Sequence, residues 1–502
     1  MTGEDIVLSI DLGSTALKLI LFSSTRKQIL CEEHPFGTYF PKEGWVEHDG
    51  EEIWGVLEKS LSKLLDSLKK EDYPSFLSIS TQRESVLLWT IGEGKSLSPI
   101  ISWQDNRTEK FINDLDNRER DFIRERTGLW ITTYSSATKL NYLVKEICEK
   151  MKGQDYLMGT LESWLIYKLT KGQHFVSDYS SASRTALLNL KTLEWDLELC
   201  DFFDVPIDKL PKLIENDREI TGVKVGNHNL SIKGVVGDQQ GALYFAKKVS
   251  EVNSSLVYGT GAFLLNLTSE ELDFQDLLDS FKGENSPLIT LAWKKVNELP
   301  RFALEWSFSN CGQSLEWLRK HINYKDLSAL NNLNLEQFNL LNCPLCLPFF
   351  SGKWLLSSRE SWNSSFYSIS SQSKSEDWII SYFEGLAFSI RAVLEEAGIK
   401  ESENILVGGG LTRNNLFSAI QSNGLGRSLI ISQWIQLSGI GVALFALQNI
   451  PKCDTKEVSI DQNKSPLFKF RYKQWSKLSW QNEKFRNSNN LWEKIILKND
   501  YC

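Results

Sequence analysis

The sequence predicts an α/β fold built from two related domains. Two observations support this prediction. Apolar runs with the character of strands alternate with helical periodicity along the chain. In addition, the strand–turn–strand pattern over 6–22 returns over 254–267, so the opening of the chain is echoed half a chain later. A chain of 502 residues has room for two large domains. We therefore expect domains at 1–248 and 249–502.

The first half begins with a predicted hairpin. Strands at 6–10 and 17–22 are joined by the turn segment DLGSTA. An amphipathic helix follows, in which leucines recur at helical spacing: Leu57, Leu61, Leu64, Leu65 and Leu68. A strand at 76–80 then leads into the loop TQRES, followed by the strand VLLW and a helix over 137–150. This alternation favours a largely parallel sheet that is covered by helices.

The second half repeats the opening pattern. The strand–turn–strand segment SSLVYGTGAFLLNL at 254–267 follows the polar stretch 247–255, which is the candidate domain boundary. Further on, ILVGGGLTRNNLF at 405–417 reads as a strand that runs into three glycines and then opens a helix. The serine-rich stretch at 357–377 is predicted to be an exposed loop.

Composition excludes several classes of protein. A net charge of −8 argues against non-specific binding to nucleic acid. The opening MTGEDIVLSIDLGS carries acidic residues where a signal peptide would be positively charged. No apolar stretch approaches the roughly 18 residues of a membrane span. We expect a cytoplasmic protein whose scattered cysteines are free thiols, and no zinc site at Cys343 and Cys346, since a second pair of ligands is missing.

Three glycine-containing segments could hold phosphate. The two hairpin turns present backbone N–H groups and hydroxyls without bulky side chains, and such donors can wrap phosphate oxygens. Beside the first turn, Asp11 could hold hydrated Mg²⁺ and Lys18 could face a phosphate. The glycines at 408–410 allow a ligand to approach the backbone closely. Taken alone, each hairpin is better explained as a plain turn in solvent, but the pair favours a nucleotide gripped from both sides.

Two further segments place polar side chains just after strands. In STQRES, Arg83 and Glu84 could bind the hydroxyl groups of a ligand, or they could form a surface ion pair. In GVVGDQQGAL, Asp238 could be a helix N-cap. Alternatively, Asp238 could accept a proton from a substrate hydroxyl while Gln239 fixes another hydroxyl.

Taken together and in order, the segments of the chain resemble a known family. They are DLGST, GWVEHDGEEIW, STQRES, ISWQDNRT, RTGLWITTYSSATKL, GTLESWLIYKLT, SDYSSASRTALLN, GDQQGAL, VYGTGAFLL and GGGLTRNNLF. This series is similar to that of the FGGY carbohydrate kinases over nearly the whole chain. The resemblance implies a duplicated, two-domain actin/hexokinase-like ATPase fold with a cleft between the domains. It also implies ATP and Mg²⁺ as cofactors, a small polyol or sugar as substrate, and a possible homo-oligomer.

The resemblance also assigns roles to residues. Asp238 matches the catalytic base and Asp11 the metal-linked acid. The residues that match the polyol-binding set are Arg83, Glu84, Trp103, Tyr134, Asp238, Gln239 and Phe263. The residues that match the nucleotide-binding set are Ser14, Thr15, Lys18, Gly259, Thr260, Gly261, Gly312, Gln313, Gly409, Gly410 and Asn414.

Within the family, the likeness is greatest to the enzymes that phosphorylate glycerol to glycerol 3-phosphate. The alternatives are a kinase for another polyol or a ketose such as xylulose, and a catalytically degenerate member that only binds ligand. Two features depart from the family pattern: the segment at 351–365, and Trp306 where a glycine is usual. The stretch at 223–233 lacks the arginine and the glycine run of the loop that binds fructose bisphosphate in some members, so we expect no such regulation.

Overall fold

The structure is a computed structural model. It describes residues 5–479 except 26, 149–154, 284–285, 309–310, 325–326, 328–329, 331–332, 351–354, 356–362, 448 and 451–452. The chain forms two compact units. Unit 1 is drawn from Met1–Ser254, Leu265–Glu305 and Trp434–Cys453, and unit 2 from Ser255–Leu264, Trp306–Gln433 and Asp454–Cys502. The functional division at 248/249 stays a prediction.

Unit 1 is built around a six-stranded sheet of order β13-β14-β5-β1-β2-β3. Its strands are β1 (Ile6–Leu12), β2 (Ala16–Ser23), β3 (Lys27–Pro35), β5 (Phe76–Thr81), β13 (Ile220–Val225) and β14 (His228–Gly237). The three central strands β14, β5 and β1 run parallel to one another, whereas β13 is antiparallel to β14, β2 to β1 and β3 to β2. The prediction of a largely parallel sheet is therefore wrong for unit 1. The reason is that hairpins flank the parallel centre on both sides, and a short turn can join only antiparallel strands.

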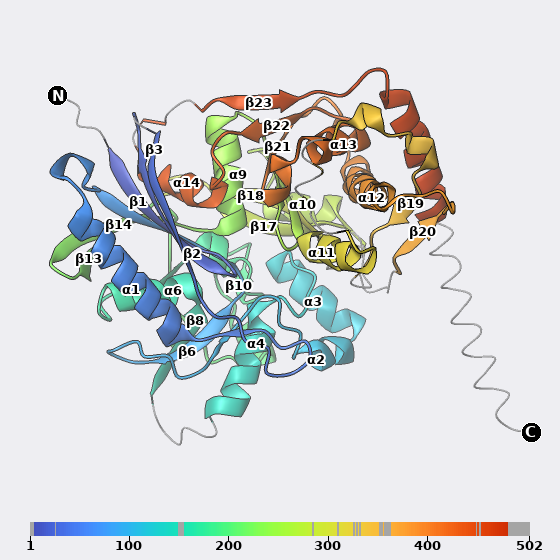
Figure 1. Ribbon diagram of the computed structural model, residues 1–502. Coiled ribbons are helices and arrows are strands. Elements are labelled where there is room, and N and C mark those ends of the chain that lie inside the picture. The colour runs from blue at the N-terminus through green and yellow to red at the C-terminus, as the bar shows by residue number, and fades with distance from the viewer. Residues whose placement is uncertain are drawn as a thin grey trace, which may run out of the picture. The chain divides into compact units, whose positions relative to one another are not determined.

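Helices cover both faces of this sheet (Figure 1). The helices α1 (Gly50–Ser67) and α6 (Leu161–Leu169) lie on one face, and α9 (Asp238–Val249) and α14 (Leu437–Ala443) on the other. The helix α1 begins at Asp49, whose side chain accepts from two backbone N–H groups of the first turn. The predicted leucine stripe is confirmed for Leu57, Leu61, Leu64 and Leu65, which are buried against the sheet.

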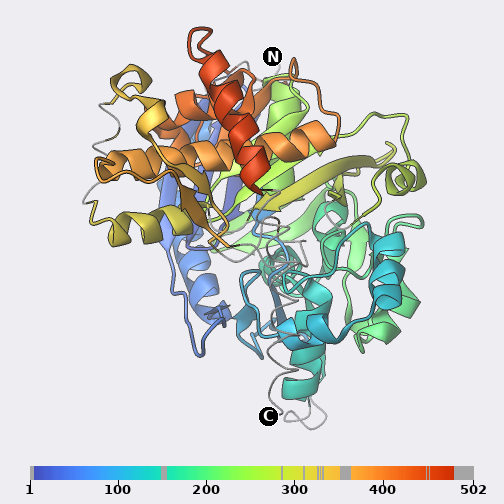
Figure 2. The same ribbon diagram turned by 90° about the vertical axis from the view of Figure 1, so that its right-hand side faces the viewer.

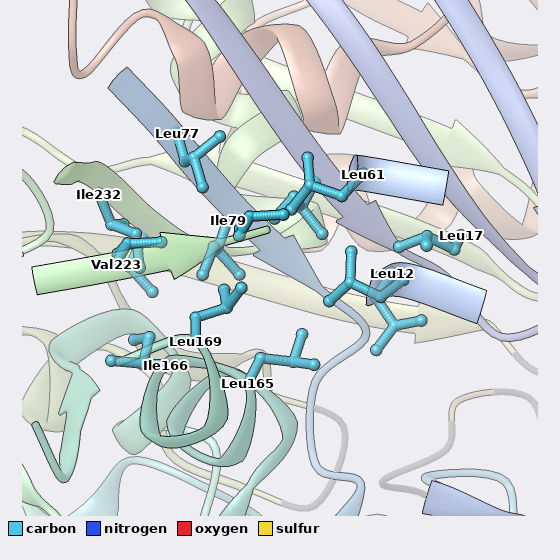
Figure 3. Close-up of a cluster of buried hydrophobic side chains, with 14 of the residues drawn as sticks. Leu12, Leu17, Leu61, Leu77, Ile79, Leu165, Ile166, Leu169, Val223 and Ile232 are labelled. Carbon is cyan, nitrogen blue, oxygen red and sulfur yellow. The ribbon is translucent and has the colours of Figure 1, made fainter. Parts of the chain in front are cut away.

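The apolar cluster between the sheet and helices α1 and α6 is the main core of unit 1 (Figure 3). Leu165 of α6 lies in this cluster with no exposed surface. We expect Leu165→Ala to lower the free energy of unfolding by about 2–5 kcal/mol, because the cavity left behind cannot fully collapse. Urea unfolding measures this, with Leu197→Ala as the control at a leucine that is 58% exposed. Equal losses in both variants would contradict the assignment of the core.

Unit 1 also contains a four-stranded sheet of order β4-β7-β6-β8 and several short helices. The sheet strands are β4 (Glu47–His48), β6 (Val86–Thr90), β7 (Ile100–Ile101) and β8 (Tyr156–Thr160). Short strands are β9 (Val176–Asp178), β10 (Leu188–Asn189), β11 (Glu194–Trp195), β12 (Lys212–Ile214) and β17 (Leu288–Trp293). The other helices are α2 (Glu109–Asp114), α3 (Asn117–Thr127), α4 (Ser136–Leu143), α7 (Tyr179–Ala182), α8 (Leu197–Phe202) and α10 (Phe274–Ser280). The predicted helix at 137–150 is α4, which continues as a π-helical turn to Cys148.

Unit 2 repeats the arrangement of hairpin and parallel strand. The hairpin strands are β15 (Ser254–Tyr258) and β16 (Ala262–Leu267), and β15 pairs in parallel with β21 (Ile405–Gly408). The sheet continues through β22 (Leu429–Ser432) to β23 (Thr455–Val458). The strand β18 (Arg301–Phe308) lies beside β16, and its residues up to Glu305 are counted in unit 1. The helices of unit 2 are α11 (Cys311–His321), α12 (Ser375–Glu396), α13 (Asn415–Leu425) and a further helix over 465–479, red in Figure 2.

The serine-rich stretch contains regular structure. The strand β20 (Ser365–Tyr367) pairs with β19 (Leu345–Leu347), and α12 begins at Ser375. The predicted loop over 357–377 is thus wrong for these residues, because β20 pairs with β19 and the ring of Phe366 packs against Trp378. Of the divergent segment 351–365, residues 351–354 and 356–362 lie outside the described residues. Among the residues that the structure describes, no helix is both long and apolar enough to cross a bilayer.

Candidate active site

Three neighbouring parallel strands of unit 1 end at the same edge of the sheet. Ser80 of β5 stands in register with Asp11 of β1 on one side and Val236 of β14 on the other. The three segments that follow these strands therefore begin side by side: Asp238 after β14, the TQRES loop after β5 and the first turn after β1. Since the carboxyl ends of parallel strands form the ligand crevice in α/β sheets, this edge is the candidate site.

Arg83 and Glu84 are buried at this edge, each 5% exposed. The Arg83 guanidinium donates from Nη1 and Nη2 to the two oxygens of Glu305, at 2.6 and 2.9 Å. Its Nε lies 3.6 Å from Oδ1 of Asp238. Glu84 has a left-handed backbone with φ of 64°, and its Oε1 accepts from Arg184 Nε at 2.7 Å. The alternative of a surface ion pair is therefore wrong.

Glu305 and Arg184 are residues that sequence reasoning missed. Arg184 Nη2 lies 3.3 Å from Oε1 of Glu305, so Arg83, Glu305, Arg184 and Glu84 form one chain of alternating charges, which we term the charged network. Glu305 has no exposed surface. A signal for it exists, because a single acid interrupts the apolar strand RFALEWSF. Arg184 lies in SDYSSASRTALLN, a segment already used for the family resemblance.

Asp238 is the first residue of α9, and Gly237 is the N-cap. The interpretation of Asp238 as an N-cap is therefore wrong. Its Oδ1 accepts from the backbone N–H of Gln239 at 2.8 Å, and Oδ2 lies 3.2 Å from Gln239 Nε2. Burial raises the pKa of Asp238 to about 7, while the positive charge of Arg83 acts in the opposite direction. A carboxyl group with a pKa near neutrality suits proton transfer at physiological pH.

Aromatic side chains stand beside these polar groups. The rings of Trp103 and Tyr134 pack edge to face with centroids 5.1 Å apart. Trp103 Nε1 donates to Ser14 Oγ at 2.9 Å, which joins the aromatic pair to the first hairpin turn. Burial, aided by the negative charge of Glu84, raises the pKa of Tyr134, so its phenol stays protonated at neutral pH. Phe263, on β16, belongs to unit 2, and its predicted packing against a polyol stays a prediction.

The first turn combines an acid, a base and small residues. Asp11 is opposite Lys18 in the hairpin, and Gly13 N–H closes the turn on Ala16 O at 3.1 Å. Burial raises the pKa of Asp11, although Lys18 partly opposes this. A carboxylate whose charge is disfavoured by burial is stabilised by a nearby cation, so Asp11 fits the predicted link to Mg²⁺.

Unit 2 brings the other predicted nucleotide segments together. Val257 of β15 is in register with Gly408 of β21, so the turn 259–261 and the glycines that follow β21 share one edge. Gly312 N–H donates to the carbonyls of Gly259 and Thr260 at 3.0 Å each. Gln313 follows Gly312 and is exposed. Asn414 caps α13 by accepting from Phe417 N–H at 2.9 Å.

The glycines at 409 and 410 have different surroundings. A Cβ on Gly409, whose φ is +96°, would lie 2.0 Å from Tyr258 O, whereas a Cβ on Gly410 would meet nothing within 4 Å. We expect Gly409→Ala to lower the free energy of unfolding by roughly 1–3 kcal/mol through backbone strain. Gly410→Ala should leave the melting temperature unchanged and weaken only nucleotide binding, measured by titration with ADP. Unchanged ADP affinity in a folded Gly410→Ala variant would remove this glycine from the predicted set.

Comparison with known proteins defines the class. The family model described as the FGGY family of carbohydrate kinases, N-terminal domain, matches residues 6–243, and the model for the C-terminal domain of the same family matches residues 254–449. The chain therefore belongs to the FGGY family of carbohydrate kinases. Membership confirms the predicted enzyme class and implies that a nucleotide and a carbohydrate are its ligands.

Individual relatives are similar over most of their length. A glycerol kinase of Bacillus anthracis is 32% identical over 434 residues, which is 83% of this chain and 84% of the relative. The crystal structure of Plasmodium falciparum glycerol kinase with ADP aligns with a TM-score of 0.78 at 23% identity. The alignment covers 95% of this chain and 98% of the Plasmodium chain. A ligand-bound xylulose kinase from Lactobacillus acidophilus has a TM-score of 0.78 at 18% identity, covering 94% and 97%. The two structures confirm the mixed α/β, two-domain fold.

Proposed function

We propose that this protein transfers the γ-phosphoryl group of ATP to a primary hydroxyl of glycerol, giving glycerol 3-phosphate. The observation that carries the proposal is the meeting of Arg83, Glu84 and Asp238 at one edge of the unit 1 sheet. The similarity to glycerol kinases over most of the chain supports glycerol as the acceptor.

Each side chain at this edge has a chemical task in the proposal. Arg83 donates a hydrogen bond to one hydroxyl group of glycerol, and Glu84 accepts a hydrogen bond from another. Gln239 Oε1 is buried and has no partner among the described residues, so it is available to accept from a further hydroxyl. The aromatic pair of Trp103 and Tyr134 packs against the carbon chain and excludes water.

Asp238 is the proposed base. Its carboxylate takes the proton of the attacking hydroxyl, for which a pKa near 7 is well suited. Proton removal is not the main source of rate in this chemistry, because the transition state of phosphoryl transfer is loose and depends on alignment and charge neutralisation. The side chains that hold the acceptor are therefore as important as the base.

The nucleotide side of the proposal uses segments from both halves of the chain. ATP with Mg²⁺ supplies the phosphoryl group that is transferred. Within residues 1–248, Asp11 is assigned to the metal, and Ser14, Thr15 and Lys18 to phosphate oxygens. Within residues 249–502, the turn 259–261, the N-terminus of α11 and the glycines 409–410 are assigned to the phosphates and the adenosine.

A substrate panel tests the proposal. Purified protein with ATP and Mg²⁺ is given glycerol, xylulose and other polyols and ketoses, and ADP release and the phosphorylated product are measured. Efficient turnover of glycerol supports the proposal. Turnover of a pentulose without turnover of glycerol would replace glycerol by that sugar. Ligand binding without turnover of any acceptor would favour the degenerate, ligand-binding alternative.

A further inference from the structure

The charged network described above carries no net charge. It contains two guanidinium groups, Arg83 and Arg184, and two carboxylates, Glu84 and Glu305. All four side chains are almost wholly buried, with exposed fractions of 6% or less. Their charges are therefore poorly screened by salt, and the balance between them decides the potential at the site.

Glu305 neutralises the very residue that is proposed to face the acceptor. Both terminal nitrogens of Arg83 donate to the two carboxylate oxygens of Glu305 in a bidentate pair. Two further ionisable groups interact with the charged network, Asp238 and Lys139, each with a pKa of about 7. The charged forms of these two groups have opposite signs, so together they do not shift the charge balance of the network. Lys139 is directed to the carbonyls of Glu84 and Tyr134, at 3.2 and 2.6 Å. With Glu305 present, Arg83 offers hydrogen bonds without a net positive charge.

We propose that Glu305 is a specificity-determining residue, which makes this site select an uncharged acceptor over one that carries a carboxylate. The inference rests on the proposed function insofar as Arg83 and Glu84 contact the acceptor. A substrate with a carboxylate would need a guanidinium whose positive charge is not already balanced by a carboxylate of the protein. Such a substrate would also be repelled by the negative charges of Glu84 and ionised Asp238. Glu305 acts through Arg83, and its effect is therefore on which ligand binds rather than on the reacting atoms.

The test compares two ligands that differ in one group. Glycerol and D-glycerate share a three-carbon chain, but a carboxylate replaces one CH₂OH in glycerate. Isothermal titration gives the affinity of each for the wild type and for Glu305→Gln, which keeps the shape and an acceptor oxygen for Arg83. We expect the affinity ratio of glycerate to glycerol to rise by roughly tenfold or more in the variant, because one buried negative charge is lost. An unchanged ratio in the folded variant overturns the inference.

Arg184→Gln supplies a second measurement that does not depend on the folding of Glu305→Gln. It removes a positive charge from the network, so the ratio of glycerate to glycerol should fall. The double variant with Glu305→Gln and Arg184→Gln is neutral again, and its ratio should return towards that of the wild type. A merely structural role for these residues would lower both affinities together, and a common loss without a change in the ratio also overturns the inference.

The matched control is Glu384→Gln in unit 2. Glu384 forms the same kind of buried bidentate pair, with Arg471 Nε and Nη2 at 2.7 and 2.6 Å. This variant should lose stability, as a thermal melt would show, without any change in the ratio of the two affinities. A shift of the ratio in this control equal to that of Glu305→Gln would show that loss of any buried pair has the effect, and would overturn the inference.

Failure of the inference and failure of the proposed function are distinguishable. If the substrate panel identifies xylulose rather than glycerol, the proposed function fails and the same titrations are made with xylulose and 2-keto-xylonate, in which a carboxylate replaces the C1 CH₂OH of xylulose. If the wild type turns over glycerol and also binds glycerate with equal affinity, the kinase assignment stands and the selectivity assigned to Glu305 is overturned.

Discussion

Asp238→Asn is expected to lower kcat by roughly 10²–10⁴-fold, the usual contribution of a positioned general base. The amide cannot take the proton of the acceptor hydroxyl, yet its Oδ1 can still accept from Gln239 N–H, as the carboxylate does. The shape of the site should therefore persist, and the affinity for the acceptor should change much less than kcat. Steady-state kinetics together with titration of the acceptor separate the two effects.

The dependence on pH gives an independent check on Asp238. Because burial raises its pKa to about 7, the wild-type rate should increase with pH through that value, and the variant should lose this inflection. The effect on stability has the opposite sign. A pKa raised above the ordinary value of 3.8 means that the folded state loses stability as the pH rises from 3.8 to about 7. This loss is complete at pH 8, so Asp238→Asn should unfold at a higher temperature than the wild type at that pH.

The control for this substitution is Asp116→Asn, at the exposed N-cap of α3, where asparagine caps equally well. It should change neither the rate nor the pH profile. A fall in kcat of less than tenfold in Asp238→Asn, with the pH profile intact, would exclude Asp238 as the base.

Arg83→Met is expected to lower the free energy of unfolding by about 3–5 kcal/mol, because it leaves a buried carboxylate without its partner. Glu305 has no exposed surface, and its short contacts with Arg83 are 2.6 and 2.9 Å. Arg184, at 3.3 Å from Glu305, compensates only incompletely, since it is already bound to Glu84. The affinity for the acceptor should fall as well.

A double-mutant cycle isolates the pair. Arg83→Met combined with Glu305→Leu should cost less than the sum of the single variants, with a coupling energy of roughly 1–3 kcal/mol, because the unpaired charge is removed with its partner. Urea unfolding measures all four proteins, and Arg118→Met, at an exposed arginine of α3, is the control. Additive losses would show that Arg83 and Glu305 do not depend on each other.

Local patterns in the sequence were sufficient for many elements. Period-two and helical apolar patterns predicted the hairpins at β1–β2 and β15–β16, the strand β5 and the leucine face of α1, because these depend on neighbours within a few residues. The positions of Arg83, Glu84 and Asp238 just after strands followed from the same patterns. Their assignment to one site came from the order of the segments and the resemblance to a family, not from any single motif.

The order of the strands in the sheets and the residues that surround the site could not be predicted from such local patterns. The antiparallel strands that flank the centre of the unit 1 sheet depend on pairings between distant segments. The same holds for β20, which exists because it meets β19. Whether Asp238 would cap its helix could not be read from its neighbours, because a shift of one residue moves the N-cap to Gly237.

Sequence patterns thus determined that the chain is a duplicated α/β protein with a glycine-containing turn between two strands in each half, and which polar residues follow its strands. Only the tertiary structure decided that Arg83 is held by Glu305, which is 222 positions away along the chain, and that Glu84 is held by Arg184. The physical reason is that a buried charge is stable only beside an opposite charge, and the fold alone selects which distant residue supplies it.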